Sequence, residues 1–466
     1  MNSYKKLFNN SMVFAIGSLG SKLLNIILVP LYTYYLSTSE YGLVDLGITT
    51  IAMLLPIVSG SMQDAVMRFS MDKSLRRDKT VTNSFLIIIL GYLLFVLLYP
   101  VINALDILPG ILKYLYIVLL LQIFDRYLAQ YARGIGLTKA FAMAGFIATL
   151  FLGIFNILFI VQFNLGVDGY FLAMMASFAI SIIYLLSQTK IYKKIQFSLV
   201  DLPFMRQLLS YSLPLIPNSL MWWIVNASSR FFILHFNGYE ANGVYAVASK
   251  IPTVINLIST VFAQAWQLSA IEEVESKKTT TFFSNIFNML VTTMFLAASL
   301  IILFIKPVLS IIVSDDFYIA WQASPFLVMG VVFSSFSSFL GAFYIATLKT
   351  NGVFRTSLIG GGLSIILNFI LIPVLGIVGA GISSMVSFFA MSVFRFFDVK
   401  RDVNLQLDYK KFFISLILIF VQTIILFTDL TISLEILLSS LGFILLLLVN
   451  KEIIIFGVKN IKNILK

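Results

Sequence analysis

Cysteine is absent from this chain of 466 residues, which excludes disulfide bonds, thiol nucleophiles and cysteine metal sites. Charge is scarce: Asp, Glu, Lys and Arg make up 11% of the residues, whereas 59% are hydrophobic. A soluble fold does not tolerate this balance. The chain also lacks a Gly-rich phosphate loop that ends in Gly-Lys-Ser or Gly-Lys-Thr. We therefore expect that this chain does not hydrolyse ATP to power its function.

Apolar stretches long enough to cross a membrane fill almost the whole sequence. A hydrocarbon core of roughly 30 Å needs about 20 apolar residues per helix. The segments 84–104, 140–162 and 285–305 meet this length without a charged residue. The sequence therefore predicts an all-α polytopic membrane protein with about fourteen transmembrane helices. We expect these helices over residues 12–36, 42–69, 82–104, 113–134, 140–163, 168–189, 209–236, 242–269, 284–305, 319–347, 355–375, 377–398, 411–428 and 431–450.

The basic residues are arranged along the chain in a way that predicts its orientation. A net charge of +11 could indicate a nucleic-acid partner, but lysine and arginine lie in the short gaps between the apolar stretches. They collect in alternate gaps, such as 73–79, 190–194 and 400–411, and the other gaps contain mainly acidic residues. This bias is typical of topology signals and predicts that both termini are cytoplasmic, with no nucleic acid bound.

Two sequence patterns recur at an offset of about 200 to 212 residues. Glu40-Tyr-Gly-Leu-Val, followed by an apolar stretch ending in Gln63, is echoed by Glu240-Ala-Asn-Gly-Val, whose apolar stretch contains Gln264. Asn156 before Leu-Gly-Val-Asp-Gly is echoed by Asn368 before Leu-Gly-Ile-Val-Gly. Six helices separate the copies, so both copies have the same orientation across the membrane. This predicts two six-helix lobes related by a pseudo-twofold axis along the membrane normal.

The repeat predicts the domain organisation of the chain. Residues 1–200 form the N-terminal lobe with the first six helices, and residues 201–405 form the C-terminal lobe with the next six. Residues 406–466 add the thirteenth and fourteenth helices and a cytoplasmic tail outside the repeat.

Several ionisable residues lie inside the predicted helices, where insertion of each costs about 2.5–3.5 kcal/mol. Such residues normally face a wet cavity or a partner. Many of them are on the first, second, seventh and eighth helices, which are repeat partners, and this distribution predicts a central cavity. The residues that we single out are Lys22, Asp64, Arg68, Asp125, Arg126, Arg230, His235 and Lys250.

The segments 22–36 (KLLNIILVPLYTYYL), 37–47 (STSEYGLVDLG) and 243–251 (GVYAVASKI) resemble a known family. The family is that of polysaccharide or oligosaccharide repeat-unit flippases of the multidrug/oligosaccharidyl-lipid/polysaccharide (MOP) exporter superfamily. The resemblance implies a flippase in the bacterial cytoplasmic (inner) membrane. It would translocate undecaprenyl-pyrophosphate-linked oligosaccharide from the cytoplasmic to the outer leaflet by alternating access, for O-antigen, capsule or similar polysaccharide biosynthesis. Its implied partners are this cargo, membrane lipids, and a polysaccharide polymerase with other assembly proteins.

The resemblance gives the buried charges expected roles. Cationic side chains in a low-dielectric cavity offset the desolvation of a pyrophosphate, so Lys22, Arg230 and Lys250 are predicted to bind the cargo. The alternative is that each reaches an interface or pairs locally. Arg133 and Arg395, like Arg68, lie at predicted cytoplasmic helix ends, where anchoring to the membrane surface is the favoured interpretation.

Coupling and sugar recognition are predicted from other residues. Without ATP, a proton or sodium gradient remains as an energy source, and Asp64 and His235 are the titratable residues that could couple to it. Gating roles are predicted for Arg68, Asp125 and Arg126, with a local structural role as the alternative. Trp222 and Trp223 could stack on sugar rings, against the alternative of ordinary packing. We expect no cofactor, no metal site and no catalytic residue.

Three other functions fit parts of the sequence. A lipid II flippase for peptidoglycan shares the fourteen helices and the cationic cavity, and it ranks second. A multidrug or cation antiporter of the same superfamily usually has twelve helices, and its cavity would favour acidic residues. An enzyme would need a sizeable extramembrane loop, and the largest outer gap, about 306–318, is too small for one.

The predicted orientation can be tested by cysteine labelling, because the chain has no native cysteine. A membrane-impermeant thiol reagent added outside intact cells should label single cysteines placed at Ser39, Asn237 and Ser314. Cysteines at Ser74, Ser198 and Ser276 should react only after permeabilisation. The reverse labelling pattern would overturn the orientation.

Overall fold

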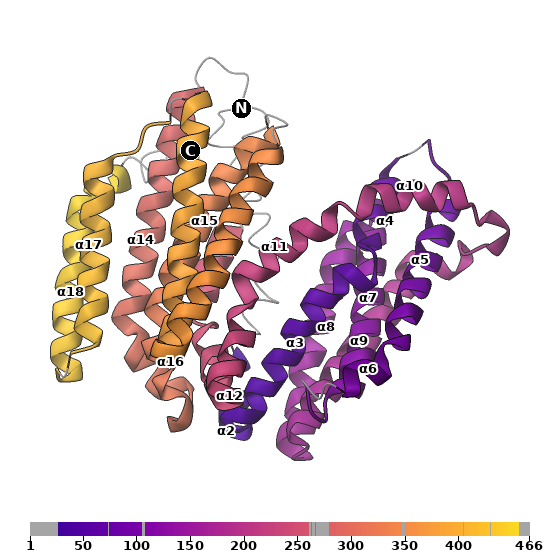
Figure 1. Cartoon of the computed structure of the whole chain (residues 1–466), viewed down its shortest axis with the longest axis horizontal. Coiled ribbons are helices and arrows are strands. Elements are labelled where there is room, and N and C mark those ends of the chain that lie inside the picture. Colours follow the sequence, from indigo (N-terminus) through magenta and orange to yellow (C-terminus); the bar gives the residue numbers. More distant parts are fainter. Residues whose placement is uncertain are drawn as a thin grey trace. The chain divides into compact units, whose positions relative to one another are not determined.

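The computed structural model describes residues 27–72, 74–104, 108–260, 262, 266, 279–346, 350–403, 405–428 and 430–455. Within these residues the secondary structure is entirely helical (Figure 1). The α-helices are α2 (Val29–Tyr35), α3 (Thr38–Val58), α4 (Met62–Met71), α5 (Arg77–Leu97), α6 (Tyr99–Ala104), α7 (Leu112–Gly134), α8 (Thr138–Asn156), α9 (Gly166–Thr189), α10 (Leu202–Ser212), α11 (Leu215–Ala227), α12 (Ser229–Ala248), α14 (Thr279–Ile312), α15 (Ser324–Ala346), α16 (Thr350–Val403), α17 (Tyr409–Leu426) and α18 (Ile432–Val449). A π-helix, η1 (Ile157–Gln162), follows α8, and the 3-10 helices are η2 (Ile191–Lys193), η3 (Phe197–Leu199) and η4 (Asp315–Gln322).

Ten helical stretches in the described part of the chain are long and apolar enough to cross a membrane. Two of them contain a turn: Gly238 in α12 and Gly376 in α16 have non-helical backbone angles. Both glycines lie where the sequence predicts one helix to end and the next to begin. The predicted all-helical, multi-pass fold is confirmed, and the number fourteen stays a prediction.

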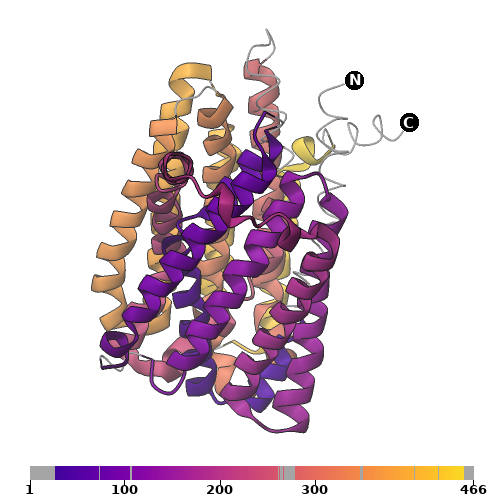
Figure 2. The same ribbon diagram turned by 90° about the vertical axis from the view of Figure 1, so that its right-hand side faces the viewer.

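The contacts divide the chain into two compact units, Leu23–Trp223 and the part from Ile224 onward. In the first unit, α7 packs against α4 and α9, and α8 packs against α9. Figure 2 shows these indigo-to-magenta helices running side by side. In the second unit, α15 and α12 both pack against α16, and α17 and α18 pack against α14. The division falls inside α11, and the lobe boundaries after residues 200 and 405 stay a prediction.

The two asparagines of the sequence repeat have the same structural role, one in each unit. Asn156, fully buried at the end of α8, donates its side-chain amide to the Tyr32 hydroxyl on α2 at 2.9 Å. Asn368, also fully buried, accepts a hydrogen bond of 3.2 Å from the Ser229 hydroxyl at the start of α12. Each asparagine therefore attaches a late helix of its unit to an early one.

The glycine motifs that follow these asparagines each contain a glycine with positive φ. Gly166 and Gly376 have φ angles of 51° and 55°, in the left-handed region that favours glycine. Gly169 and Gly379 come next, where a Cβ atom would lie 3.1 Å from Phe159 and 2.4 Å from Leu371 backbone oxygens. The repeat in the sequence thus corresponds, in both units, to a glycine with positive φ followed by a glycine that lies against backbone atoms.

A second asparagine pair holds the segments that lead into α10 and α17. In the first unit, the Asn83 side chain donates to the Leu199 carbonyl at 2.9 Å and accepts from the Asp201 amide at 2.9 Å. In the second, Asn288 donates to the Gln406 carbonyl at 3.0 Å and accepts from the Asp408 amide at 3.1 Å. We call these two arrangements the asparagine clamps.

The aspartate held by each asparagine clamp also begins the next helix. Asp201 accepts from the Phe204 amide at the start of α10 and forms an ion pair with Lys79. Its hydrogen bond from Lys79 holds the pKa of the Asp201 carboxyl below its usual value. Asp408 accepts from the Lys411 amide at the start of α17 and forms an ion pair with the Lys411 side chain. The chain therefore enters α10 and α17 through the same device.

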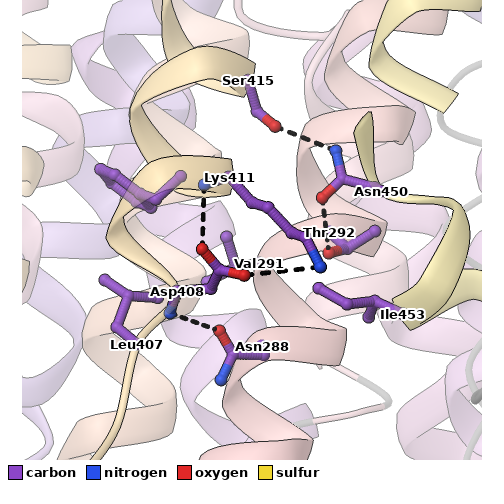
Figure 3. Close-up of a pocket in the computed structure, with 10 residues that line it drawn as sticks. Asn288, Val291, Thr292, Leu407, Asp408, Lys411, Ser415, Asn450 and Ile453 are labelled. Carbon is purple, nitrogen blue, oxygen red and sulfur yellow. Dashed lines mark hydrogen bonds and ion pairs between the residues drawn. The ribbon is translucent and has the colours of Figure 1, made fainter. Parts of the chain in front are cut away.

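Polar contacts connect the C-terminal helices to α14 (Figure 3). Asn450 accepts from the Thr292 hydroxyl at 3.2 Å and donates to Ser415 at 3.0 Å, so one amide joins α14, α17 and the end of α18. Further along, Lys306 and Glu435 form a largely buried ion pair of 2.6 Å. Because lipid is as apolar as a leucine surface, such polar contacts help fix which helix faces pack together.

The asparagine clamps predict an effect on stability. Asn83→Ala and Asn288→Ala should each lower the apparent melting temperature of the purified protein in detergent by several degrees, because each leaves backbone groups without partners at about 1–3 kcal/mol. The control is Asn103→Ala, since Asn103 is exposed on α6. Equal melting temperatures for all three variants would show that the clamps do not hold these segments.

Candidate functional site

The second predicted helix, 42–69, is broken into α3 and α4. Gly60 and Ser61 both adopt left-handed backbone angles, with φ of 58° and 52°. The amides of Gly60, Ser61 and Met62 are satisfied by carbonyls of the turn, at 3.0–3.1 Å. A Cβ atom on Gly91 of α5 would lie 2.3 Å from the Val58 carbonyl oxygen, so a glycine lets α5 pack against the break. The predicted helix ran across this break, although Pro56, the triplet Ser59-Gly60-Ser61 and the more polar sequence of α4 were signals for it.

The break places Asp64 in the first turn of α4, where the helix dipole favours a carboxylate. Asp64 is half-buried and interacts electrostatically with Arg126 of α7. Arg126 also interacts with its neighbour Asp125, which accepts a hydrogen bond from the Ser181 hydroxyl of α9. The structure thus brings together three of the residues singled out from the sequence. We call Asp64, Asp125 and Arg126 the acid–arginine cluster.

Arg68 lies apart from the acid–arginine cluster. It is exposed in the last turn of α4, and it interacts electrostatically with Asp72 just beyond the helix. The electrostatic partner found for Asp64 is Arg126, rather than Arg68 one turn away. The gating roles of these residues stay predictions.

Two glutamines extend the polar face of α7 beyond Arg126. Gln122 and Gln130 lie four residues to either side of it, on the same face of the helix. The side-chain carbonyl oxygens of both are buried and accept no hydrogen bond from the described residues. Together with the acid–arginine cluster they give α7 a polar stripe of more than two turns. These glutamines were not among the predicted site residues, although their spacing of four residues around Arg126 was the signal.

Arg230 and Lys250, two of the residues predicted to bind the cargo, lie around the Ser249–Pro252 turn that follows α12. Arg230 donates from one terminal nitrogen to Ser249 Oγ at 3.1 Å and from the other to the Asn226 carbonyl at 3.3 Å. Its guanidinium also lies over the Tyr245 ring, 5.5 Å from the centroid. Lys250, half-buried, follows Ser249 directly. Arg230 is therefore held beside the turn that contains Lys250.

The remaining predicted site residues lie elsewhere. His235 is exposed near the Gly238 turn, with its ring against Phe236. Trp223 donates its indole N–H to the Thr49 carbonyl of α3 at 2.9 Å, and Trp222 is half-buried next to it. Lys22 lies outside the described residues. Among the described residues no group of three His, Asp or Glu side chains is placed to hold a metal ion.

Arg395 corrects one interpretation from the sequence. It was expected to anchor a helix end at the membrane surface, but only 1% of its surface is exposed. The guanidinium donates to the Ser337 carbonyl at 2.7 Å, to Thr356 Oγ1 at 2.8 Å and to Ser357 Oγ at 3.0 Å. Arg395 therefore connects α15 to both halves of α16 in the interior of the unit. Anchoring at the surface is wrong for this residue.

Comparisons with solved structures identify the fold. The inward closed conformation of the lipid II flippase MurJ is 16% identical, with a TM-score of 0.64 over 95% of this chain and 100% of that chain. The outward-facing conformation of a MATE family multidrug resistance transporter of the MOP superfamily is 14% identical, with a TM-score of 0.62 over 87% and 96%. A MOP superfamily transporter from Pyrococcus furiosus is 15% identical, with a TM-score of 0.64 over the same shares. No curated protein sequence matches the chain.

The described helices form a multi-pass membrane fold similar to that of MurJ and of the MATE family transporter. Residues 7–267, more than half of the chain, match the family described as "Polysaccharide biosynthesis protein". The chain belongs to this family. The resemblance recognised from the segments 22–47 and 243–251 is thus confirmed.

The acid–arginine cluster predicts coupled effects of substitution. Asp64→Asn and Arg126→Gln should each lower the apparent melting temperature, and the double variant should lower it by less than the sum. The coupling should be on the order of 1 kcal/mol, as is usual for residues in one charge network. The control cycle pairs Asp64→Asn with Arg68→Gln and should be additive. Additive losses in the Asp64 and Arg126 cycle would show that the two charges do not interact.

Proposed function

We propose that this protein is a flippase for undecaprenyl-pyrophosphate-linked oligosaccharide repeat units. It moves them from the cytoplasmic to the outer leaflet of the bacterial inner membrane by alternating access, for assembly of a surface polysaccharide. The family match is the observation that carries the proposal. Because the chain of this polysaccharide biosynthesis family has a transporter fold, its part in the pathway is to move an intermediate across the membrane.

The basic residues support an anionic cargo. A pyrophosphate loses hydration on entering the membrane interior, and fixed cations there offset that loss better than cations exposed to water. Arg230 is the best placed of these residues among the described ones, because Ser249, Asn226 and Tyr245 hold its planar fork in position. An arginine fork can bind phosphate oxygens through two parallel hydrogen bonds. Lys22 and Lys250 would add charge to the same cargo site.

A lipid II flippase is the second candidate function. It is favoured by the MurJ structure, which is matched over its entire length. The family description favours a polysaccharide intermediate instead, and we place that cargo first. A multidrug or cation antiporter ranks third, on the likeness to the MATE transporter.

Energy for transport would come from a proton or sodium gradient. The acid–arginine cluster supports this part of the proposal, because Asp64 and Asp125 share one arginine. Protonation or cation binding at either carboxylate would change the net charge around Arg126. This change would alter the packing of α4 against α7. A polymerase outside would consume the translocated units and draw the reaction forward.

The cationic cargo site can be tested in a flippase-null strain by measuring polysaccharide output, normalised to the amount of protein in the membrane. Lys22→Gln and Arg230→Gln should each reduce output at least tenfold, because each removes a charge that binds the pyrophosphate. Arg230→Lys should restore only part of the output, since lysine keeps the charge but loses the bidentate fork. Asp64→Asn should also reduce output without changing abundance.

The control is Lys139→Gln, which removes an exposed lysine at the start of α8. This variant should keep wild-type output. Full output from both Lys22→Gln and Arg230→Gln would refute the anionic cargo and favour the antiporter. Restoration of growth in a strain depleted of its lipid II flippase, without polysaccharide output, would select the second candidate.

A further inference from the structure

An apolar cavity of about 210 Å³ lies within the unit Leu23–Trp223, between α5, α7, α9 and η2. No charged side chain lines it, and the only polar side-chain atoms among its lining residues are two tyrosine hydroxyls. One of these, on Tyr127, already bonds with Ser84 at 2.8 Å and with the Val81 carbonyl at 3.2 Å. The cavity therefore suits a hydrocarbon group. Its lining residues are Phe85, Phe124, Tyr127, Leu128, Ile182, Leu186, Ile191, Tyr192 and Ile195.

The turn that closes one end of this cavity is held in place. Lys190 ends α9 with left-handed backbone angles, φ 50° and ψ 34°, and the chain turns directly into η2. Thr82 of α5 accepts a hydrogen bond of 3.0 Å from the Gln196 amide, and Lys194 forms an ion pair of 3.2 Å with Asp78 of α5. The cavity is thus a preformed feature of the unit.

The same turn combines the cavity wall with positive charge. Ile191, Tyr192 and Ile195 line the cavity, whereas Lys190 and Lys193 are exposed beside them. Neither of these two lysines forms an ion pair with a described acidic residue. Tyr192 is 56% exposed although it lines the cavity, so the cavity reaches the surface next to the lysines.

We propose that this cavity and turn bind an anionic glycerophospholipid. One acyl chain enters the cavity, and the phosphate lies beside Lys190 and Lys193. The charge complementarity of the two lysines favours an anionic over a zwitterionic headgroup. The turn lies in a gap that the charge bias predicts to be cytoplasmic, where a bilayer lipid has its headgroup at the same level as the lysines. All of the site belongs to one unit. Its residues are not those predicted to bind the cargo, so the proposal does not depend on which cargo is transported.

The proposal can be tested by native mass spectrometry of the full-length purified protein in detergent. After removal of bound lipid, the protein is titrated with phosphatidylglycerol or phosphatidylcholine. Phosphatidylglycerol should bind with one site of highest affinity, and the double variant Lys190→Gln/Lys193→Gln should bind it about tenfold more weakly. Leu186→Trp and the smaller change Ile182→Phe should weaken binding by filling the cavity, with melting temperature recorded as a check of folding.

The control double variant, Lys139→Gln/Lys410→Gln, removes the same charge from exposed lysines elsewhere and should leave binding unchanged. Unchanged affinity in the Lys190→Gln/Lys193→Gln variant would overturn the proposal, as would equal weakening in the control. Equal affinity for phosphatidylcholine would also contradict it. If a polyprenyl diphosphate displaces phosphatidylglycerol and responds to the same substitutions, the site belongs to the cargo and not to a phospholipid.

Discussion

The hydrocarbon core of a membrane contains no water to hydrogen-bond a polar group, and most of this structure follows from that constraint. Helices satisfy their own backbones, and where α3 ends before α4 the turn supplies carbonyls for the amides that the break exposes. Several buried polar side chains have partners on other helices. Asn156 finds Tyr32, and Arg395 finds carbonyls and hydroxyls of two neighbouring helices.

These partners give the helix packing its specificity. Apolar side chains gain little by leaving lipid for another apolar surface, so a hydrogen bond between helices selects one pairing among many similar ones. The two asparagine clamps are examples of such selective hydrogen bonds. They position α10 and α17 through the same donor and acceptor pattern. The parallel extends the internal symmetry beyond the two predicted lobes to the helix that follows each of them.

The sequence predicted the features that depend on local length and charge. Gly238 and Gly376 interrupt the structure in the predicted gaps, because a gap between apolar stretches is visible residue by residue. It did not predict the break at Gly60, because one helix was expected over 42–69, although α4 is more polar than α3. The role of Arg395 was wrong for another reason, since distance from a helix end does not show which neighbours a side chain meets. In the candidate site, the sequence identified the charged residues, whereas the pairing of Asp64 with Arg126 needed the packing of α4 on α7.

The asparagine clamp of the first unit has a consequence for how the chain is made. Asn83 requires only residues up to 201, so every group in this clamp is synthesised before the second unit begins at Ile224. Domains generally fold as units in the order in which they are translated. The clamp can therefore form within the first unit without any residue of the second. The clamp at Asn288 requires residues up to 408. It can therefore form only when α17 and α18 alone remain to be synthesised.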